Sequence, residues 1–379
     1  MPTPPSHQLS SEIARLGTST LSRRQLLRHA GVGGAALMFG GVLAACSRAE
    51  DASGSAAPAT PDSVPGLNIT HFGGPYDALA GIVAAPALAA SIAEVSYEAE
   101  TSGSAVARLA AGNSGLDIVQ VSRTPALAAF RDGLLQPLDV GLLSNLGDLA
   151  ENYRLVDEGD VAGITMVLDG VDLMYRSDLV DAPITSWMDL FRDDVAGRIG
   201  LPGSNLSSSW LTVVALSRAL GNDYANGEVE EAFAMLEELE TRAVVSDPNQ
   251  LTQLIDSGDI LVAPQYSARI ANVRAENSDI AAAAATEGVP AQPYDLCIVA
   301  DSEQVEAAHA YIDFAISRDV QRELADALLA TPASSAVELT DEDLATLSVN
   351  PAGVFFLDED MIAEFRGGWE DRYARNVEA

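Results

Sequence analysis

Polar and aromatic side chains follow three short apolar segments in the first third of the sequence. The segments cover residues 67–72, 95–99 and 116–121, and each has the length and composition of a buried strand. Hydroxyl and guanidinium groups bind small anions, whereas aromatic rings cover aliphatic groups and cations. The candidate binding residues at these strand ends are Phe72, Gly73, Tyr76, Ser102, Ser122 and Arg123.

A serine-rich turn opens a helical segment in the middle of the chain. Residues 203–209 read Gly-Ser-Asn-Leu-Ser-Ser-Ser, and a helix is predicted from Ser204 to residue 220. Hydroxyl groups at a helix N-terminus satisfy free backbone N–H groups, and the same end attracts anions. Ser204 or Asn205 is therefore either a helix cap or a ligand contact, and both interpretations stay open.

Two further side chains would suit a cationic ligand. Asp295 precedes an apolar run that is predicted to be a strand, and Tyr266 follows another such run. A desolvated ammonium group needs a carboxylate partner and is stabilised by an aromatic ring. A cationic ligand would therefore depend on Asp295, and an anionic ligand would depend on Arg123.

Motifs of common enzyme classes are absent from the sequence. It contains no G-x-S-x-G elbow, no H-E-x-x-H motif and no phosphate-binding G-x-x-x-x-G-K-[ST] loop. Only two of its four histidines, His71 and His309, lie beyond the N-terminal export signal. We therefore expect no catalysis, no metal site and no cofactor, and a secreted hydrolase is the weaker alternative.

The N-terminus carries an export signal. Arg23 and Arg24 precede an uncharged apolar run over residues 31–45, which is too short to span a bilayer core of about 30 Å. Paired arginines are typical of the twin-arginine export route. The run ends in Leu-Ala-Ala-Cys, which resembles a bacterial lipobox. We therefore predict that residues 1–45 are removed and that Cys46 carries a lipid anchor.

The composition excludes several classes of partner. The 379 residues carry a formal net charge of -34, and all 21 basic residues are arginine. Such a chain is not expected to bind nucleic acid, or an anionic bilayer by charge. Cys297 is the only cysteine besides Cys46, so we expect no disulfide. Residues 46–66 are rich in serine, alanine and proline and predict a flexible tether.

The order of predicted elements indicates an α/β fold with two lobes. Strands and helices alternate over residues 67–121, as in a parallel sheet with right-handed crossovers. The segments 164–168 and 171–175 suit a connection to a second lobe, and residues 294–299 suit the return. We predict lobe 1 from residues 67–165 and 292–333, and lobe 2 from residues 166–291 and 334–379.

Several short segments occur in an order that is typical of one family. They are residues 73–76, 108–112 with 117–119, 133–139, 184–190 and 307–314. Together they resemble the bacterial extracellular solute-binding proteins of ABC importers, in the spermidine/putrescine-binding group. The resemblance implies a type II periplasmic-binding-protein fold, in which two α/β lobes close on a ligand. It also implies delivery of a small solute to an ABC permease, and we expect a lipid-anchored monomer on the extracytoplasmic side of a membrane.

The resemblance implies a polyamine-like cation as the ligand, and Asp295 stands where the family keeps a carboxylate. However, residues 203–209 contain no acid where polyamine binders tend to have one. A small anionic solute with a carboxylate or phosphate group, or Fe(III), is the alternative ligand. A ligand-sensing lipoprotein is the alternative role.

Overall fold

The computed structural model describes residues 64–112 and 114–378. The predicted signal peptide with Arg23 and Arg24, the predicted lipid site Cys46 and most of the predicted tether lie outside these residues. Among the described helices, none combines the length and the hydropathy that crossing a membrane requires.

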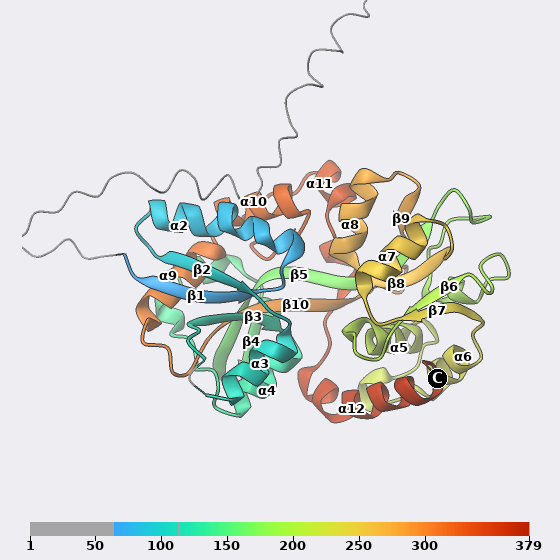
Figure 1. The fold of residues 1–379 in the computed structure, drawn as a ribbon, viewed down its shortest axis with the longest axis horizontal. Coiled ribbons are helices and arrows are strands. Elements are labelled where there is room, and N and C mark those ends of the chain that lie inside the picture. The colour runs from blue at the N-terminus through green and yellow to red at the C-terminus, as the bar shows by residue number, and fades with distance from the viewer. Residues whose placement is uncertain (1–63, 113, 379) are drawn as a thin grey trace, which may run out of the picture. The chain divides into compact units, whose positions relative to one another are not determined.

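One sheet runs through the whole described fold (Figure 1). Its main path has the order β2-β1-β3-β10-β5-β8-β6-β7, and four short strands pair outside this path. The strands are β1 (Gly66–His71), β2 (Glu94–Ala99), β3 (Ile118–Ser122), β4 (Arg154–Asp157), β5 (Asp160–Arg176), β6 (Ile199–Pro202), β7 (Thr241–Val245), β8 (Val262–Tyr266), β9 (Ile280–Ala282), β10 (Val289–Ile298), β11 (Thr331–Pro332) and β12 (Val354–Phe355).

Two long antiparallel strands, β5 and β10, pass from one lobe to the other (Figure 1). We call them the hinge strands. β5 is a single strand of 17 residues, so the prediction of two separate segments was wrong. Asp169 and Gly170 interrupt the apolar pattern of β5, but both are paired with β10. This pairing keeps the backbone extended across the two polar positions.

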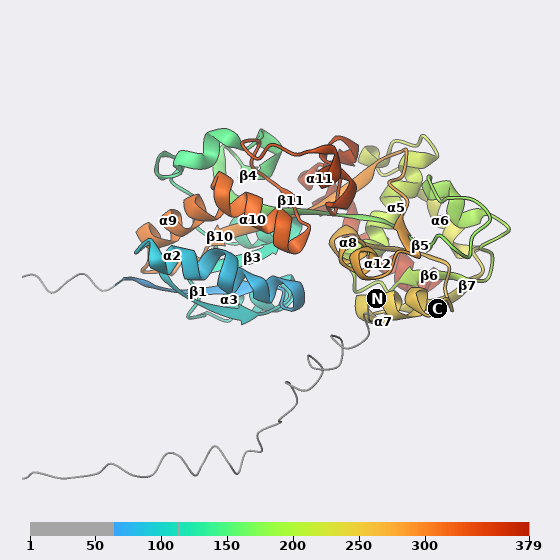
Figure 2. The same ribbon diagram turned by 90° about the horizontal axis from the view of Figure 1, so that it is seen from above.

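Lobe 1 is built on the three predicted N-terminal strands, which are confirmed with ends shifted by at most two residues. β1 pairs in parallel with β2 and β3. One face of the sheet packs on α2, α9 and α10, and the other face packs on α3 and α4 (Figures 1 and 2). The helices of this lobe are α2 (Ala85–Ala89), α3 (Ser102–Ala110), α4 (Arg123–Arg131), α9 (Val305–Ala315) and α10 (Arg318–Leu328).

Lobe 2 is built on the parallel strands β6, β7 and β8. Its main apolar core includes Trp187, Trp210 and Trp369. The helices of this lobe are α5 (Ser207–Ala219), α6 (Glu230–Glu237), α7 (Pro248–Asp256), α8 (Ser267–Glu276) and α12 (Glu359–Asn376).

The C-terminal segment contacts both lobes. α11 (Asp341–Thr346) is tied to α10 by an ion pair of 2.9 Å between Arg322 and Asp343. α12 packs into the core of lobe 2 through Met361 and Ile362. Near its start, α12 also reaches α4, where Arg131 and Asp360 form an ion pair of 2.7 Å. Residues 334–379 were all predicted to belong to lobe 2, but this segment contacts both lobes.

Candidate ligand-binding site

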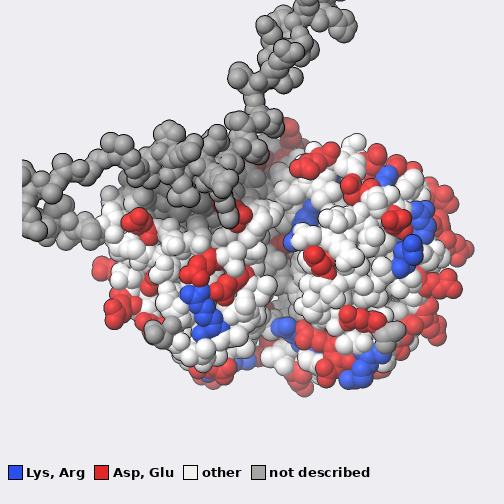
Figure 3. Space-filling view, in the orientation of Figure 1, with Lys and Arg blue, Asp and Glu red and all other residues white. Residues whose placement is uncertain are grey.

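A groove separates the two lobes on the face shown in Figure 3. The strand directions place the carboxyl ends of β1 and β3 on one side of it and those of β6 and β8 on the other. In α/β sheets, ligands bind outside such strand ends. Acidic side chains are spread over both lobes, and arginines gather in a few places (Figure 3).

The turn after β1 depends on a glycine. Gly73 has a φ of +69°, and an added Cβ would lie 3.2 Å from the Cβ of Ala99. Its backbone N–H donates to Nδ1 of His71 over 2.9 Å, so His71 has a structural partner. The turn leads into the helical turn Gly74–Ala78, which carries Tyr76. Phe72 and Tyr76 are thereby held together at the end of β1.

Three aromatic rings meet between β1 and the hinge strand β10, and we call them the aromatic cluster. They belong to Phe72, Tyr76 and Tyr294. The ring centroids of Phe72 and Tyr294 lie 4.5 Å apart, and those of Tyr76 and Tyr294 lie 6.1 Å apart. Such a cluster can cover the aliphatic part of a solute or a cationic group.

A buried carboxylate, Asp169 of β5, lies beside the aromatic cluster. Its Oδ1 accepts hydrogen bonds from the backbone N–H groups of Gly170 and Ala268, over 2.8 and 2.9 Å. Burial raises the pKa of Asp169 to about 6, although these bonds and the charge of Arg269 lower it. Burial also raises the pKa of Tyr76 and Tyr294, and the charge of Asp169 adds to both shifts. The site therefore contains one carboxylate next to aromatic hydroxyls.

Lobe 2 faces this place with Tyr266, Ser207 and Arg269. The hydroxyl groups of Tyr266 and Ser207 lie 3.1 Å apart. Arg269 stands in the first turn of α8 and donates to the side chain of Asn249 over 2.5 Å. Its positive charge lowers the pKa of Tyr76 and Tyr294 against the larger effect of burial. Groups from lobe 1, the hinge strands and lobe 2 therefore converge on one region.

Arg123 and Asp295, predicted as separate ligand contacts, bind each other. Two hydrogen bonds of 3.0 and 3.1 Å join the guanidinium to the carboxylate. Thr165 donates to Asp295 over 2.7 Å, and the carbonyl of Asn152 accepts from Arg123 over 2.7 Å. The side chain of Asp295 is completely buried. A shift in register between β10 and β5 occurs next to it, between Tyr294 and Asp295.

A small buried pocket of about 10 Å³ lies beside this ion pair, with room for one water molecule. Two of its lining atoms, Nε1 of Trp210 and Oε1 of Gln292, have no hydrogen-bond partner among the described residues. A third lining side chain, Glu359, accepts a hydrogen bond from Thr124 over 3.2 Å. Burial raises the pKa of Glu359 to about 7, which the charge of Arg123 opposes.

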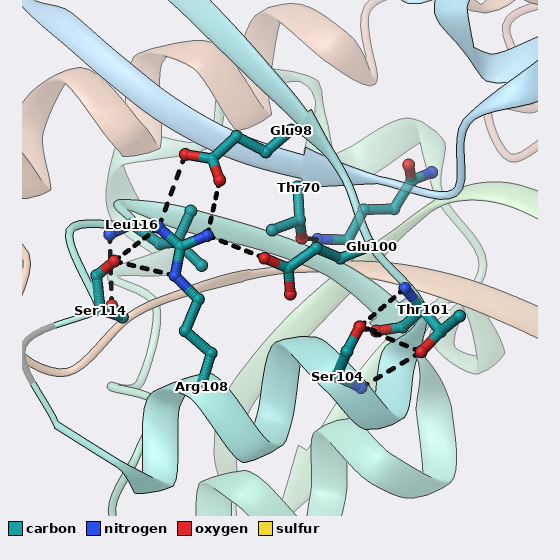
Figure 4. A network of polar contacts seen from close by, with 9 residues as sticks. Thr70, Glu98, Glu100, Thr101, Ser104, Arg108, Ser114 and Leu116 are labelled. Atoms are coloured by element: carbon teal, nitrogen blue, oxygen red, sulfur yellow. Dashed lines mark hydrogen bonds and ion pairs between the residues drawn. The ribbon is translucent and has the colours of Figure 1, made fainter.

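The predicted residues Ser102 and Ser122 form a pair at the ends of β2 and β3. Their hydroxyl oxygens lie 3.1 Å apart, and the N–H of Ser122 donates to Ser102 over 2.9 Å. Figure 4 shows how α3 is held in place: Arg108 binds Glu98 and Glu100, at 2.6 and 2.8 Å. These ion pairs hold the last turn of α3 against β2, and the capping box of Thr101 and Ser104 holds its start.

Ser204 and Asn205 have other partners than those predicted. α5 begins at Ser207 and not at Ser204, and no side chain caps it, so of the two open interpretations the helix cap was wrong. The backbone N–H of Ser204 donates to Glu378 over 3.0 Å, and Asn205 donates to the carbonyl of Ser246 over 3.1 Å. The hydroxyl of Ser204 also donates to the side-chain carboxylate of Glu378, over 2.5 Å.

Four residues of the candidate site, Asp169, Ser207, Arg269 and Tyr294, were not among the predicted contacts. Asp169 stood between two apolar segments that were interpreted as a connection, and Tyr294 preceded the predicted Asp295. Arg269 stood in a segment for which no element was predicted. The available signal was position: Asp169 and Tyr294 lie on the two long strands that pass between the lobes.

Residues 91–349 match the sequence profile of a family described as bacterial extracellular solute-binding protein. The chain belongs to this family. Members of the family bind small solutes and deliver them to ABC permeases. The expected solute-binding class is confirmed at this level. No curated protein gives a significant sequence match.

Solved structures of solute-binding proteins share the fold. An ABC transporter substrate-binding protein from Bradyrhizobium japonicum aligns with a TM-score of 0.72 and 18% identity, over 83% of this chain and 99% of its own. The spermidine/putrescine-binding protein of Streptococcus pneumoniae gives 0.69 and 15%, over 82% and 98%. A binding protein from Agrobacterium tumefaciens in complex with agropinic acid gives 0.67 and 19%, over 83% and 99%. The predicted two-lobe α/β fold is confirmed.

Proposed function

We propose that this solute-binding protein holds one small polar solute in the groove between its lobes and delivers it to an ABC permease. The observation that carries the proposal is the convergence of lobe 1, the hinge strands and lobe 2 on the aromatic cluster and Asp169. A solute that touches all three parts stabilises the closed arrangement over the open one.

The proposed contacts follow from the exposed and partly exposed groups of this region. Phe72, Tyr76 and Tyr294 would cover the solute, and Tyr266 would contact it from lobe 2. Ser102 and Ser122 would offer hydroxyl groups from lobe 1. Arg123 and Asp295 would hold the wall of the groove, because each already has the other as partner.

A binding screen tests the function. The purified chain would be titrated with polyamines, amino acids, opines, sugars, phosphate, phosphonates and Fe(III), and thermal unfolding would be followed. A true ligand at about 100 times its Kd adds about 2.7 kcal/mol of stability. Tyr294→Ala should abolish this gain, whereas Tyr224→Ala, which removes a ring outside the groove, should keep it. A ligand whose effect survives Tyr294→Ala contradicts the proposed site.

We propose further that the protein is exported through Arg23 and Arg24 and anchored by lipid on Cys46, as a monomer. Membrane fractionation tests the anchor: Cys46→Ser should release the exported protein from the membrane. Replacing Arg23 and Arg24 by lysine should block export. Metabolic labelling with a radioactive fatty acid should label the wild-type chain and not the Cys46→Ser variant. Equal labelling of the wild type and the variant contradicts the proposed anchor.

A further inference from the structure

We propose that the solute carries one cationic and one carboxylate group, as an amino acid or an ω-amino acid does, and is not a polycation. This inference rests on the proposed function, because it concerns the ligand of the same groove. It follows from the charged groups that surround the aromatic cluster.

The hinge strands offer too few carboxylates near the aromatic cluster for a polyamine. Asp295 is completely buried and holds Arg123 through two hydrogen bonds. Asp169 is the other hinge-strand carboxylate near the cluster, and it can provide a partner for one ammonium group. A second ammonium group of a polycation would lose its water without gaining a carboxylate, which is costly in a buried site.

Arg269 supplies the opposite charge. Its one side-chain hydrogen bond goes to the neutral amide of Asn249, and no acidic side chain of the described residues forms an ion pair with it. It stands in the first turn of α8, directly after Ala268, whose backbone N–H donates to Asp169 over 2.9 Å, so this end of α8 lies against the strand that carries Asp169. A guanidinium without an acidic partner repels a second cation and is suited to a carboxylate.

The two charges stand on different elements, Asp169 on β5 and Arg269 on α8. An ammonium group would lie near Asp169 and the rings of the aromatic cluster, where cation–π attraction adds to the ion pair. A carboxylate would lie on the side of lobe 2, where Arg269 and the paired hydroxyls of Ser207 and Tyr266 can donate hydrogen bonds. The site thus binds both ends of a zwitterion through different lobes.

A series of probes with equal chain length tests this assignment. Putrescine, 4-aminobutanoate and succinate have four carbon atoms each. Putrescine carries two ammonium groups, 4-aminobutanoate carries one ammonium and one carboxylate group, and succinate carries two carboxylates. The series would be extended to the three- and five-carbon homologues and to the common α-amino acids, and Kd would be measured by calorimetry. We expect at least one zwitterion to bind at least tenfold more tightly than the diamine and the diacid of the same length.

Tighter binding of a diamine or a diacid overturns the zwitterion assignment while the proposed solute-binding function stands. The zwitterion assignment is also overturned if no zwitterion binds at millimolar concentration. The broad binding screen then still decides the proposed function. The two proposals therefore fail through different results.

A charge-matched pair of variants tests the role of Arg269. Arg269→Gln should weaken binding of the zwitterion at least tenfold and leave the Kd of the diamine unchanged or lower. Arg242→Gln removes the same charge at an exposed position of β7 and should change neither affinity. Equal unliganded melting temperatures would show that both variants fold. An unchanged zwitterion affinity in Arg269→Gln overturns the assignment.

Discussion

Arg123 and Asp295, 172 residues apart in the chain, bind each other through two hydrogen bonds in the wall of the groove. Their side chains are 8% and 0% exposed, so the pair belongs to the interior. From the sequence alone, single substitutions at these positions were expected to distinguish a cationic from an anionic ligand. Because the two side chains bind each other, such substitutions cannot do so. They would test the stability of the wall.

Removal of one partner from this ion pair should destabilise the protein strongly. Asp295→Ala leaves the guanidinium of Arg123 buried without its carboxylate, which we expect to cost about 3–5 kcal/mol of unfolding free energy in urea. The double variant Arg123→Met/Asp295→Leu should lose less, because no charge remains buried. Asp157→Ala breaks the more exposed pair with Arg131 and should cost less than about 1 kcal/mol. Equal losses in Asp295→Ala and Asp157→Ala would contradict the buried role.

Glu359 should make the protein less stable as the pH rises. Burial raises its pKa from 4.5 to about 7, so the folded state keeps a proton that the unfolded state loses over this range. The contribution of Glu359 to the unfolding free energy is therefore most favourable below pH 4.5. It falls by roughly 3 kcal/mol as the pH rises to about 7. Glu359→Gln should flatten the slope of unfolding free energy against pH between 5 and 7. Asp360→Asn, at the exposed neighbouring position, serves as the control. A slope unchanged by Glu359→Gln would show that this carboxyl does not hold the proton.

Gly73 should tolerate no side chain. Gly73→Ala forces a residue with a Cβ into a left-handed conformation, which costs roughly 1–2 kcal/mol, and brings that Cβ to 3.2 Å from Ala99. The displaced turn should also weaken ligand binding, because Phe72 and Tyr76 flank it. Gly81→Ala, with an ordinary φ and open space, should be close to neutral in both measurements. A Gly73→Ala protein with wild-type melting temperature and affinity is the contrary result.

The sequence predicts local structure well and long-range pairing poorly, for a physical reason. Apolar runs bounded by glycine and proline located β1 and β3, because burial of these runs is a local property of the chain. The pairing of Ser204 with Glu378 spans 174 residues and has no local signal. Asp169 was missed for a related reason. Asp169 and Gly170 interrupt the apolar pattern of the sequence, and only the pairing of β5 with β10 shows that they lie within one continuous strand.

Asp169 and Asp172 provide a matched test that separates binding from stability. Both lie on β5, both have a pKa raised to about 6 by burial, and both accept hydrogen bonds from two backbone N–H groups. Of the two, Asp169 is nearer to the aromatic cluster, since it pairs with Gln292, two residues from Tyr294 on β10. Replacement by asparagine keeps an acceptor oxygen and removes the buried charge in each case.

We expect both Asp169→Asn and Asp172→Asn to be at least as stable as the wild type above pH 6, because the folded state no longer has to bury an ionised carboxylate. The gain should be of the order of 1–3 kcal/mol and should vanish below pH 4, where the wild-type carboxyls are protonated in both states. Asp169→Asn alone should weaken binding of an ammonium-bearing solute, by at least tenfold. Thermal unfolding across pH and calorimetric titration measure the two effects separately. Equal loss of affinity in both variants would mean that the carboxylate acts through the strand and not on the solute.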